Sequence, residues 1–177
     1  MTYRTILAAG AAFLMVAGAV PALAQSTATV NGSGSVTVLR PLTIAKDLDL
    51  RFGTVVRPST GSGTAVVSAA SVRSFTGGVV GLSSGDTPQA AQFTVGGEGG
   101  QSVSLTIPAT FSIANGADSL TVTTSNNLVG SAAAQTLSGA MGSAGTLVFR
   151  VGGSIPVAST SATGLYTGAF SVTAAYN

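Results

Sequence analysis

Hydrophobic and polar positions alternate along most of the chain, most clearly in its last fourteen residues, Gly164 to Asn177. Aromatic, aliphatic and small residues occupy the even positions of this run, whereas the odd positions are mostly small or polar. A period of two is typical of a strand that buries one face. The run therefore predicts a C-terminal strand that large side chains tie into the core. The predicted anchors are Tyr166, Phe170, Val172 and Tyr176.

A second alternating run lies near the start of the chain, from Thr27 to Ile44. Its even positions are small or aliphatic, and most of its odd positions are Thr, Asn or Ser. Pro41 interrupts the run, and a proline in a strand favours a sheet edge because it cannot donate a ladder hydrogen bond. We expect residues 25–44 to form an extended segment that is a candidate donor strand. The donor positions are Ala28, Val30, Gly32, Gly34, Val36 and Val38.

The chain after this segment, residues 45–177, is expected to form one β-sandwich domain. Lys46 to Gly53 alternates with Leu48, Leu50 and Phe52 on one face. Gly96 to Gly100 predicts a hairpin between two later alternating runs, and Asn115 with Gly116 predicts another turn. Further strands are expected at 64–70, 79–82, 91–95, 103–107, 111–113, 120–122, 147–151 and 155–157.

Eight or nine strands, turns about ten residues apart and no helical period after residue 24 predict an all-β fold. The expected architecture is an immunoglobulin-like β-sandwich of antiparallel strands. With 153 residues after residue 24, the chain is long enough to bury a core as one domain.

Residues 1–24 have the order of a secretory signal peptide. Arg4 precedes an uncharged run from Ile6 to Val20, and Ala22 to Ala24 forms a small-x-small cleavage site. The alternative is a membrane anchor, but the apolar run is shorter than the roughly 20 residues that a bilayer requires. We expect cleavage after Ala24 and no membrane span in the mature chain. The expected location is the periplasm, cell surface or an extracellular filament of a Gram-negative bacterium.

Charge and cysteine content narrow the choice of function further. Removal of Arg4 leaves six Lys and Arg residues against five Asp and Glu residues, with no basic cluster, so nucleic-acid binding is not expected. The chain has no cysteine, and in an oxidising compartment its stability must come from packing. Only 7% of its residues are charged and 24 are glycine, which favours a surface that packs against copies of the same chain.

The residue inventory excludes most catalytic mechanisms. Without histidine and cysteine there is no Ser-His-Asp relay, no thiolate and no conventional zinc site. A hydroxyl-lysine dyad would have to use Lys46, the only lysine, with Thr43 three residues before it, and the pattern does not favour it. A calcium site at Asp47 and Asp49 is not expected either, because two carboxylates supply too few ligands. The remaining acids are expected in separate turns: Asp86, Glu98 and Asp118. We expect no enzymatic activity, catalytic residue, metal or cofactor.

Three segments carry a resemblance to a known family: TIAKDLDLRFGTVVRP, AAQFTVGGEGG and GLYTGAFSVTAAYN. They resemble the bacterial secreted proteins grouped as domain of unknown function 4402 over essentially the whole mature chain. The resemblance implies an exported β-sandwich without naming an activity. More loosely, the alternating N-terminal segment and Tyr176 are similar to subunits of chaperone-usher fimbriae. That similarity implies a periplasmic chaperone and an outer-membrane usher as partners, although many such subunits carry a disulfide and this chain has no cysteine.

The leading functional hypothesis is a structural subunit of a fimbria, pilus or other surface assembly that joins copies of itself by β-strand donation. A monomeric periplasmic or cell-surface module that binds a ligand such as a glycan is the alternative, and an enzyme is the third class. The sequence leaves open whether the N-terminal segment pairs within its own subunit or with a neighbour.

Overall fold

A computed structural model describes residues 26–83 and 86–177. Within these ranges the chain contains twelve strands and no helix, and so no helix that is long and apolar enough to span a membrane. The all-β prediction is confirmed. The chain divides into two compact units, Met1–Val36 and Thr37–Asn177, and all the strands belong to the second. The predicted signal peptide, residues 1–24, lies outside the described residues.

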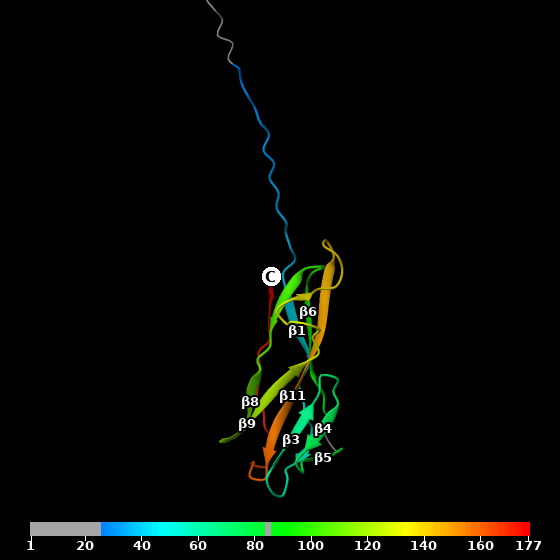
Figure 1. The fold of residues 1–177 in the computed structure, drawn as a ribbon, viewed down its shortest axis with the longest axis vertical. Helices are drawn as coiled ribbons and strands as arrows, with labels where there is room; N and C mark the ends of the chain where they lie inside the picture. Colours follow the sequence, from blue (N-terminus) through cyan, green and yellow to red (C-terminus); the bar gives the residue numbers. More distant parts are fainter. Residues whose placement is uncertain (1–25, 84–85) are drawn as a thin grey trace, which may run out of the picture. The chain divides into compact units, whose positions relative to one another are not determined.

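The larger sheet has seven strands arranged around β11, which is long enough to pair with different partners along its length (Figure 1). Residues 144–151 of β11 pair with β6, residues 151–154 with β9, and residues 153–158 with β3. Strand β1 extends the sheet beyond β6, β4 extends it beyond β3, and β8 pairs with β9. The bounds are β1 Thr43–Leu48, β3 Ser62–Val67, β4 Arg73–Thr76, β6 Ala91–Glu98, β8 Thr110–Asn115, β9 Asp118–Asn126 and β11 Ala144–Ala158.

Two smaller sheets complete the domain. Strand β7 lies between β10 and β12 in a three-stranded sheet, and β2 pairs with β5. The bounds are β2 Val55–Val56, β5 Val80–Gly81, β7 Ser102–Thr106, β10 Gln135–Thr136 and β12 Thr173–Tyr176. Because β2, β5 and β10 have only two residues each, nine longer strands remain, in agreement with the predicted eight or nine.

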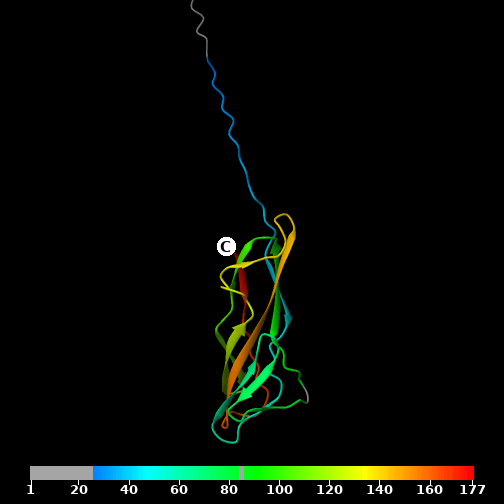
Figure 2. The same ribbon diagram turned by 45° about the vertical axis from the view of Figure 1, so that its right-hand side comes forward.

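The seven-stranded and three-stranded sheets enclose a common apolar core. Phe93 of β6 and Phe149 of β11 stack at 5.5 Å between ring centroids, and both belong to one buried cluster with Val103 and Leu105 of β7. Figure 2 shows the red C-terminal strand β12 and the orange strand β11 in these two different sheets. The fold is therefore the predicted antiparallel β-sandwich. We call the part in which both sheets supply strands to the core the closed half.

A second apolar cluster lies on the same large sheet, beside the last residues of β11. Its buried members are Ala65, Val79, Val122, Ile155 and Val157. Here mostly irregular chain from residues 49–57 and 161–170 takes the place of a second sheet. In this region the C-terminal run pairs with β8 through an isolated bridge between Ala114 and Thr167. We call this part the open half.

The predicted hairpin at Gly96 to Gly100 is wrong. Strand β6 pairs with β1 and β11, whereas β7 pairs with β10 and β12, so the glycines carry the chain from one sheet to the other. A Cβ at Gly99 would lie 2.6 Å from the carbonyl oxygen of Ala140, so the connection packs too tightly for a larger residue. Two alternating runs joined by glycines look alike in a hairpin and in a crossover, because the pattern does not identify the pairing partner.

Three other local predictions need correction. The C-terminal strand is shorter than predicted and begins only at Thr173, although the even positions remain the more buried ones except at Gly168. In the run 79–82, Val79 is buried but Val80 is 55% exposed, because β5 pairs only with β2 at the edge of the domain. Glu98 lies at the end of strand β6, not in a turn, and is buried.

Candidate functional site

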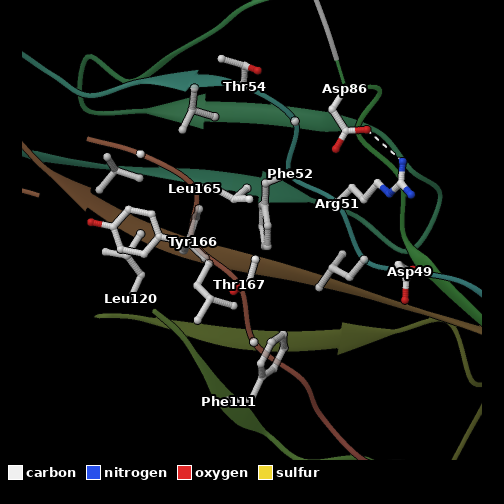
Figure 3. Close-up of a pocket in the computed structure, with 18 of the residues that line it drawn as sticks. Asp49, Arg51, Phe52, Thr54, Asp86, Phe111, Leu120, Leu165, Tyr166 and Thr167 are labelled. Carbon is white, nitrogen blue, oxygen red and sulfur yellow. Dashed lines mark hydrogen bonds and ion pairs between the residues drawn. The ribbon is translucent and has the colours of Figure 1, made fainter. Parts of the chain in front are cut away.

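The open half contains an apolar groove with a volume of about 800 Å³. Its walls are residues 49–57 on one side and 161–170 on the other, and strands of the large sheet form its floor (Figure 3). Volumes of this size are typical of binding sites. Apolar side chains dominate the floor: Ala91, Phe93, Phe111, Ile113, Leu120, Ile155 and Val157.

The first wall, residues 49–57, is held by one arginine together with short backbone pairings. The guanidinium of Arg73 donates hydrogen bonds to the carbonyl oxygens of Phe52 at 3.1 Å, Thr54 at 3.3 Å and Leu82 at 2.9 Å. The side chain of Phe52 packs against the second apolar cluster. Gly53 has a φ of +71°, a left-handed conformation that glycine adopts without strain. These side-chain hydrogen bonds supplement short backbone pairings along this wall, namely the bridge of Arg51 to Gln89 and the pair of β2 with β5.

The second wall, residues 161–170, is held by several side-chain hydrogen bonds and one backbone bridge. The hydroxyl of Tyr166 donates to the carboxylate of Asp118 and contacts the carbonyl oxygen of Ala162 at 2.9 Å. Arg57 donates to the carbonyl oxygen of Ser161 at 2.5 Å. The hydrogen bond from Tyr166 holds the pKa of the Asp118 carboxyl below its usual range, and the same bond raises the pKa of Tyr166.

Charged residues lie at the rim of the groove and are paired with one another. Lys46 contacts Asp49 at 2.5 Å, and Arg51 contacts Asp86 at 3.0 Å, as Figure 3 shows for the second pair. The hydrogen bond from Lys46 lowers the pKa of Asp49. Exposed pairs of this kind contribute about 0 to 1 kcal/mol to stability. The rim therefore offers no strong anchor for a charged ligand, and an apolar extended chain fits the lining better.

The acids and the lysine that were considered for chemistry have structural contacts. Asp47 accepts hydrogen bonds from Thr94 at 2.7 Å and Gln92 at 3.3 Å, across the β1–β6 pair. Thr43 donates to the carbonyl oxygen of Gly96 at 3.3 Å, while Lys46 pairs with Asp49. In the described ranges no three Asp or Glu residues gather where they could hold a metal ion.

The candidate donor residues lie outside the strands. Ala28, Val30, Gly32, Gly34 and Val36 belong to the first unit, and Val38 is near the start of the second. Val30, Val36 and Val38 are 95%, 85% and 83% exposed. Exposed valines at alternate positions of an unpaired segment are unusual for a soluble surface, which makes the segment a candidate for pairing with another sheet.

The predicted C-terminal anchors are distributed over both halves. Tyr166 lines the groove, whereas Val172 and Tyr176 pack against the core of the closed half. Phe170 lies between the two halves, with its ring centroid 4.7 Å from that of Phe111 and 5.9 Å from that of Phe93.

Sequence reasoning placed Phe52 and Phe111 on the apolar faces of strands but did not predict the groove. It also missed the contact of Tyr166 with Asp118 and the burial of Glu98. No local sequence pattern predicts these features, because each of them joins residues that are far apart in the chain.

The fold and the groove define an antiparallel β-sandwich whose apolar core is only partly covered by strands. The family model described as Domain of unknown function (DUF4402) matches residues 42–176, so the chain belongs to this family, as its sequence segments suggested. No curated protein and no solved structure matched the chain. The looser similarity to fimbrial subunits has no support from these comparisons and stays a prediction.

Proposed function

We propose that this protein is an exported, non-enzymatic structural subunit that assembles with copies of itself by β-strand donation. Residues 28–38 of one copy fill the apolar groove of another. The observation that carries the proposal is that one chain contains both an apolar groove without a covering sheet and an exposed alternating segment. Its place is outside the cytoplasm, in the periplasm or at the cell surface, after removal of the predicted signal peptide.

The chemistry of the segment matches that of the groove. Residues 26–39 carry no charged side chain, and the groove floor is apolar. Burying each of Val30, Val36 and Val38 is worth at most about 1.5 to 3 kcal/mol, before the cost of ordering the segment. Gly32 and Gly34 lie on the same face, where the absence of side chains lets two backbones approach closely. Association driven in this way depends little on salt, because charge pairing contributes little to it.

Backbone groups that an added strand requires are present beside the groove. In the described part of the chain, β8, which supplies Phe111 and Ile113 to the groove floor, pairs with β9 and otherwise only through the bridge of Ala114 to Thr167. An edge with free N–H and C=O groups next to an apolar surface favours pairing with another chain. Strand addition of this kind is β-augmentation, in which the ladder gives affinity and alternate side chains give register.

A monomeric module that binds a glycan is the second candidate function. The observation in its favour is that aromatic rings line the same groove, among them Phe52, Phe111 and Tyr166. Sugar rings stack on exposed aromatic faces, but Phe52 and Phe111 are also packed against the apolar cluster.

Deletion of residues 25–39, with the signal peptide kept, tests the proposal. We expect the full chain to form an SDS-resistant ladder and the shortened chain to be an unstable or aggregating monomer. A peptide of residues 26–39 added in trans is expected to restore solubility at about one peptide per chain. The matched control is the same peptide with Val30→Ser, Val36→Ser and Val38→Ser, which keeps the length but loses the apolar anchors.

A shortened chain that stays folded, monomeric and stable without the peptide would contradict strand donation. The glycan-binding module predicts instead that the full chain is monomeric and that the deletion leaves sugar binding unchanged, as measured on a glycan array.

A further inference from the structure

A buried carboxylate contacts Arg40, the residue that follows the donor positions, and does not line the groove. Glu98, at the end of β6, is only 4% exposed. It accepts hydrogen bonds from the backbone N–H of Gly142 and, at 3.4 Å, from the backbone N–H of Arg40. The Nε atom of Arg40 is also 3.4 Å from Glu98, and its guanidinium donates to the carbonyl oxygen of Gly142 at 3.2 Å. The proposed function does not use this cluster for binding.

The hydroxyl of Tyr176 completes the cluster from the opposite sheet. It accepts a hydrogen bond from the backbone N–H of Glu98 at 2.7 Å and donates one to the carbonyl oxygen of Arg40 at 2.9 Å. Space for the hydroxyl exists because residue 97 is glycine: a Cβ there would lie 2.4 Å from it. We call Arg40, Glu98 and Tyr176 the latch.

The latch fixes both backbone groups of Arg40, its N–H and its C=O. Pro41 follows, and the residue before a proline is restricted to extended conformations. Chain reversal at Arg40 is therefore blocked twice, once by the hydrogen bonds and once by the proline. A tight hairpin that folds the donor segment back along β1 would need to reverse near this position.

The latch also lies beyond one end of the groove along the large sheet. Glu98 pairs with Ala144 at the start of β11, whereas the groove floor extends from Phe93, which pairs with Phe149, to Ile155 near the end of β11. At about 3.3 Å per residue, Ala144 is roughly 17 Å from Phe149 and roughly 36 Å from Ile155 along the strand. A segment that reversed at Arg40 would keep Val36 and Val38 near the latch and bring only its first residues to the groove.

We propose that the latch prevents the chain from filling its own groove and so commits the donor segment to a second copy. This inference rests on the proposed function and names its partner: another molecule of the same chain, in an open head-to-tail series. The hydrogen bonds of Tyr176 and Glu98 determine whether the donor segment binds its own copy or another one. Without them the backbone of Arg40 is restrained only by Pro41.

Disulfide trapping tests the latch cleanly, because the chain has no cysteine of its own. One cysteine replaces Val30 in the donor segment, and another replaces Leu165 at the groove wall, which is 80% exposed. In this background, non-reducing electrophoresis separates crosslinks within one chain from crosslinks between chains. We expect crosslinks almost only between chains, and a rise of about tenfold in the within-chain fraction on Tyr176→Phe.

Glu98→Gln is the second latch variant, in case Tyr176→Phe does not fold. Asn177→Ala is the matched control: this neighbouring side chain bonds to Ser102 at 2.8 Å and to the Ala133 carbonyl at 3.0 Å, without touching Arg40. A folded latch variant with an unchanged within-chain fraction would overturn the latch. A largely within-chain product in the parent would overturn it as well. Absence of either crosslink in every variant would instead contradict strand donation itself.

Discussion

The closed and open halves of the sandwich bury the same kinds of side chain, yet they are covered in different ways. In the closed half β7 and β12 face the large sheet, and Phe149 is 1% exposed. In the open half irregular walls take the place of the second sheet and leave a groove of about 800 Å³. An apolar sheet face therefore does not guarantee a complete core, because covering it requires strands that the chain does not provide at that end.

The two kinds of cover also differ in how easily another strand can replace them. Strand β12 satisfies the backbone groups of one of its edges through a continuous ladder with β7. The groove walls depend more on side chains such as Arg73 and Tyr166, and their backbone pairings are short. Each such bond contributes about 1 kcal/mol net, so local opening of a wall costs much less than opening the closed half.

Truncating one phenylalanine in each half should give the largest difference between the two halves in the free energy of unfolding. Phe149→Ala removes a fully buried ring, and we expect a loss of roughly 3 to 5 kcal/mol in the free energy of unfolding. Phe111→Ala removes a partly buried ring from the groove floor, and about 1 to 2 kcal/mol is expected. Urea unfolding of both variants, measured in the full mature chain at one protein concentration, compares them under the same conditions. Equal losses would show that the open half is as tightly packed as the closed half.

A methyl group at Gly168 should disturb the open half alone. Its Cβ would lie 2.2 Å from the carbonyl oxygen of Ser112, so Gly168→Ala must push the second wall away from β8. We expect a stability loss of about 1 to 3 kcal/mol, with faster hydrogen exchange at the amides of Ala114 and Thr167. Ser171→Ala, at an exposed position of the same run, is the control. Unchanged exchange at both amides would mean that the wall is not held by this bridge.

The smallest effect is expected from removal of the Tyr166 hydroxyl. Because this hydroxyl lowers the pKa of Asp118, Tyr166→Phe should raise that pKa toward the usual aspartate value of about 3.9. A carboxyl whose pKa is lowered in the folded state stabilises the fold at pH values above its unfolded-state pKa. This stabilisation is lost as the pH falls through the folded-state pKa. The variant lacks most of it and should therefore lose less stability on acidification below about pH 4.

Carboxyl carbon NMR titration measures this shift directly. The pKa of Asp49, which Lys46 lowers independently, should not change and serves as the internal control. An unchanged Asp118 pKa in the folded variant would show that the hydrogen bond to Tyr166 does not hold this wall.

The sequence by itself determined the fold class, the family and most strand faces. Alternation is a local property of a strand, so the apolar faces of β6 and β11 and the turn at Asn115 and Gly116 were readable from the chain. The same alternation appears at the C-terminus, where Phe170, Val172 and Tyr176 are partly buried as predicted although the regular strand begins only at Thr173.

Only the tertiary structure decided which strands pair and where the core stays uncovered. The glycine-rich connection before β7 looks like a hairpin in sequence, but it crosses between sheets because β11 occupies the place beside β6. Tyr176 contacts both Glu98 and Arg40. These two residues lie 78 and 136 positions before it in the sequence, respectively. Periodicity tells which side of a strand is apolar, but the pairing partner and the uncovered groove depend on contacts between distant residues, which no local pattern encodes.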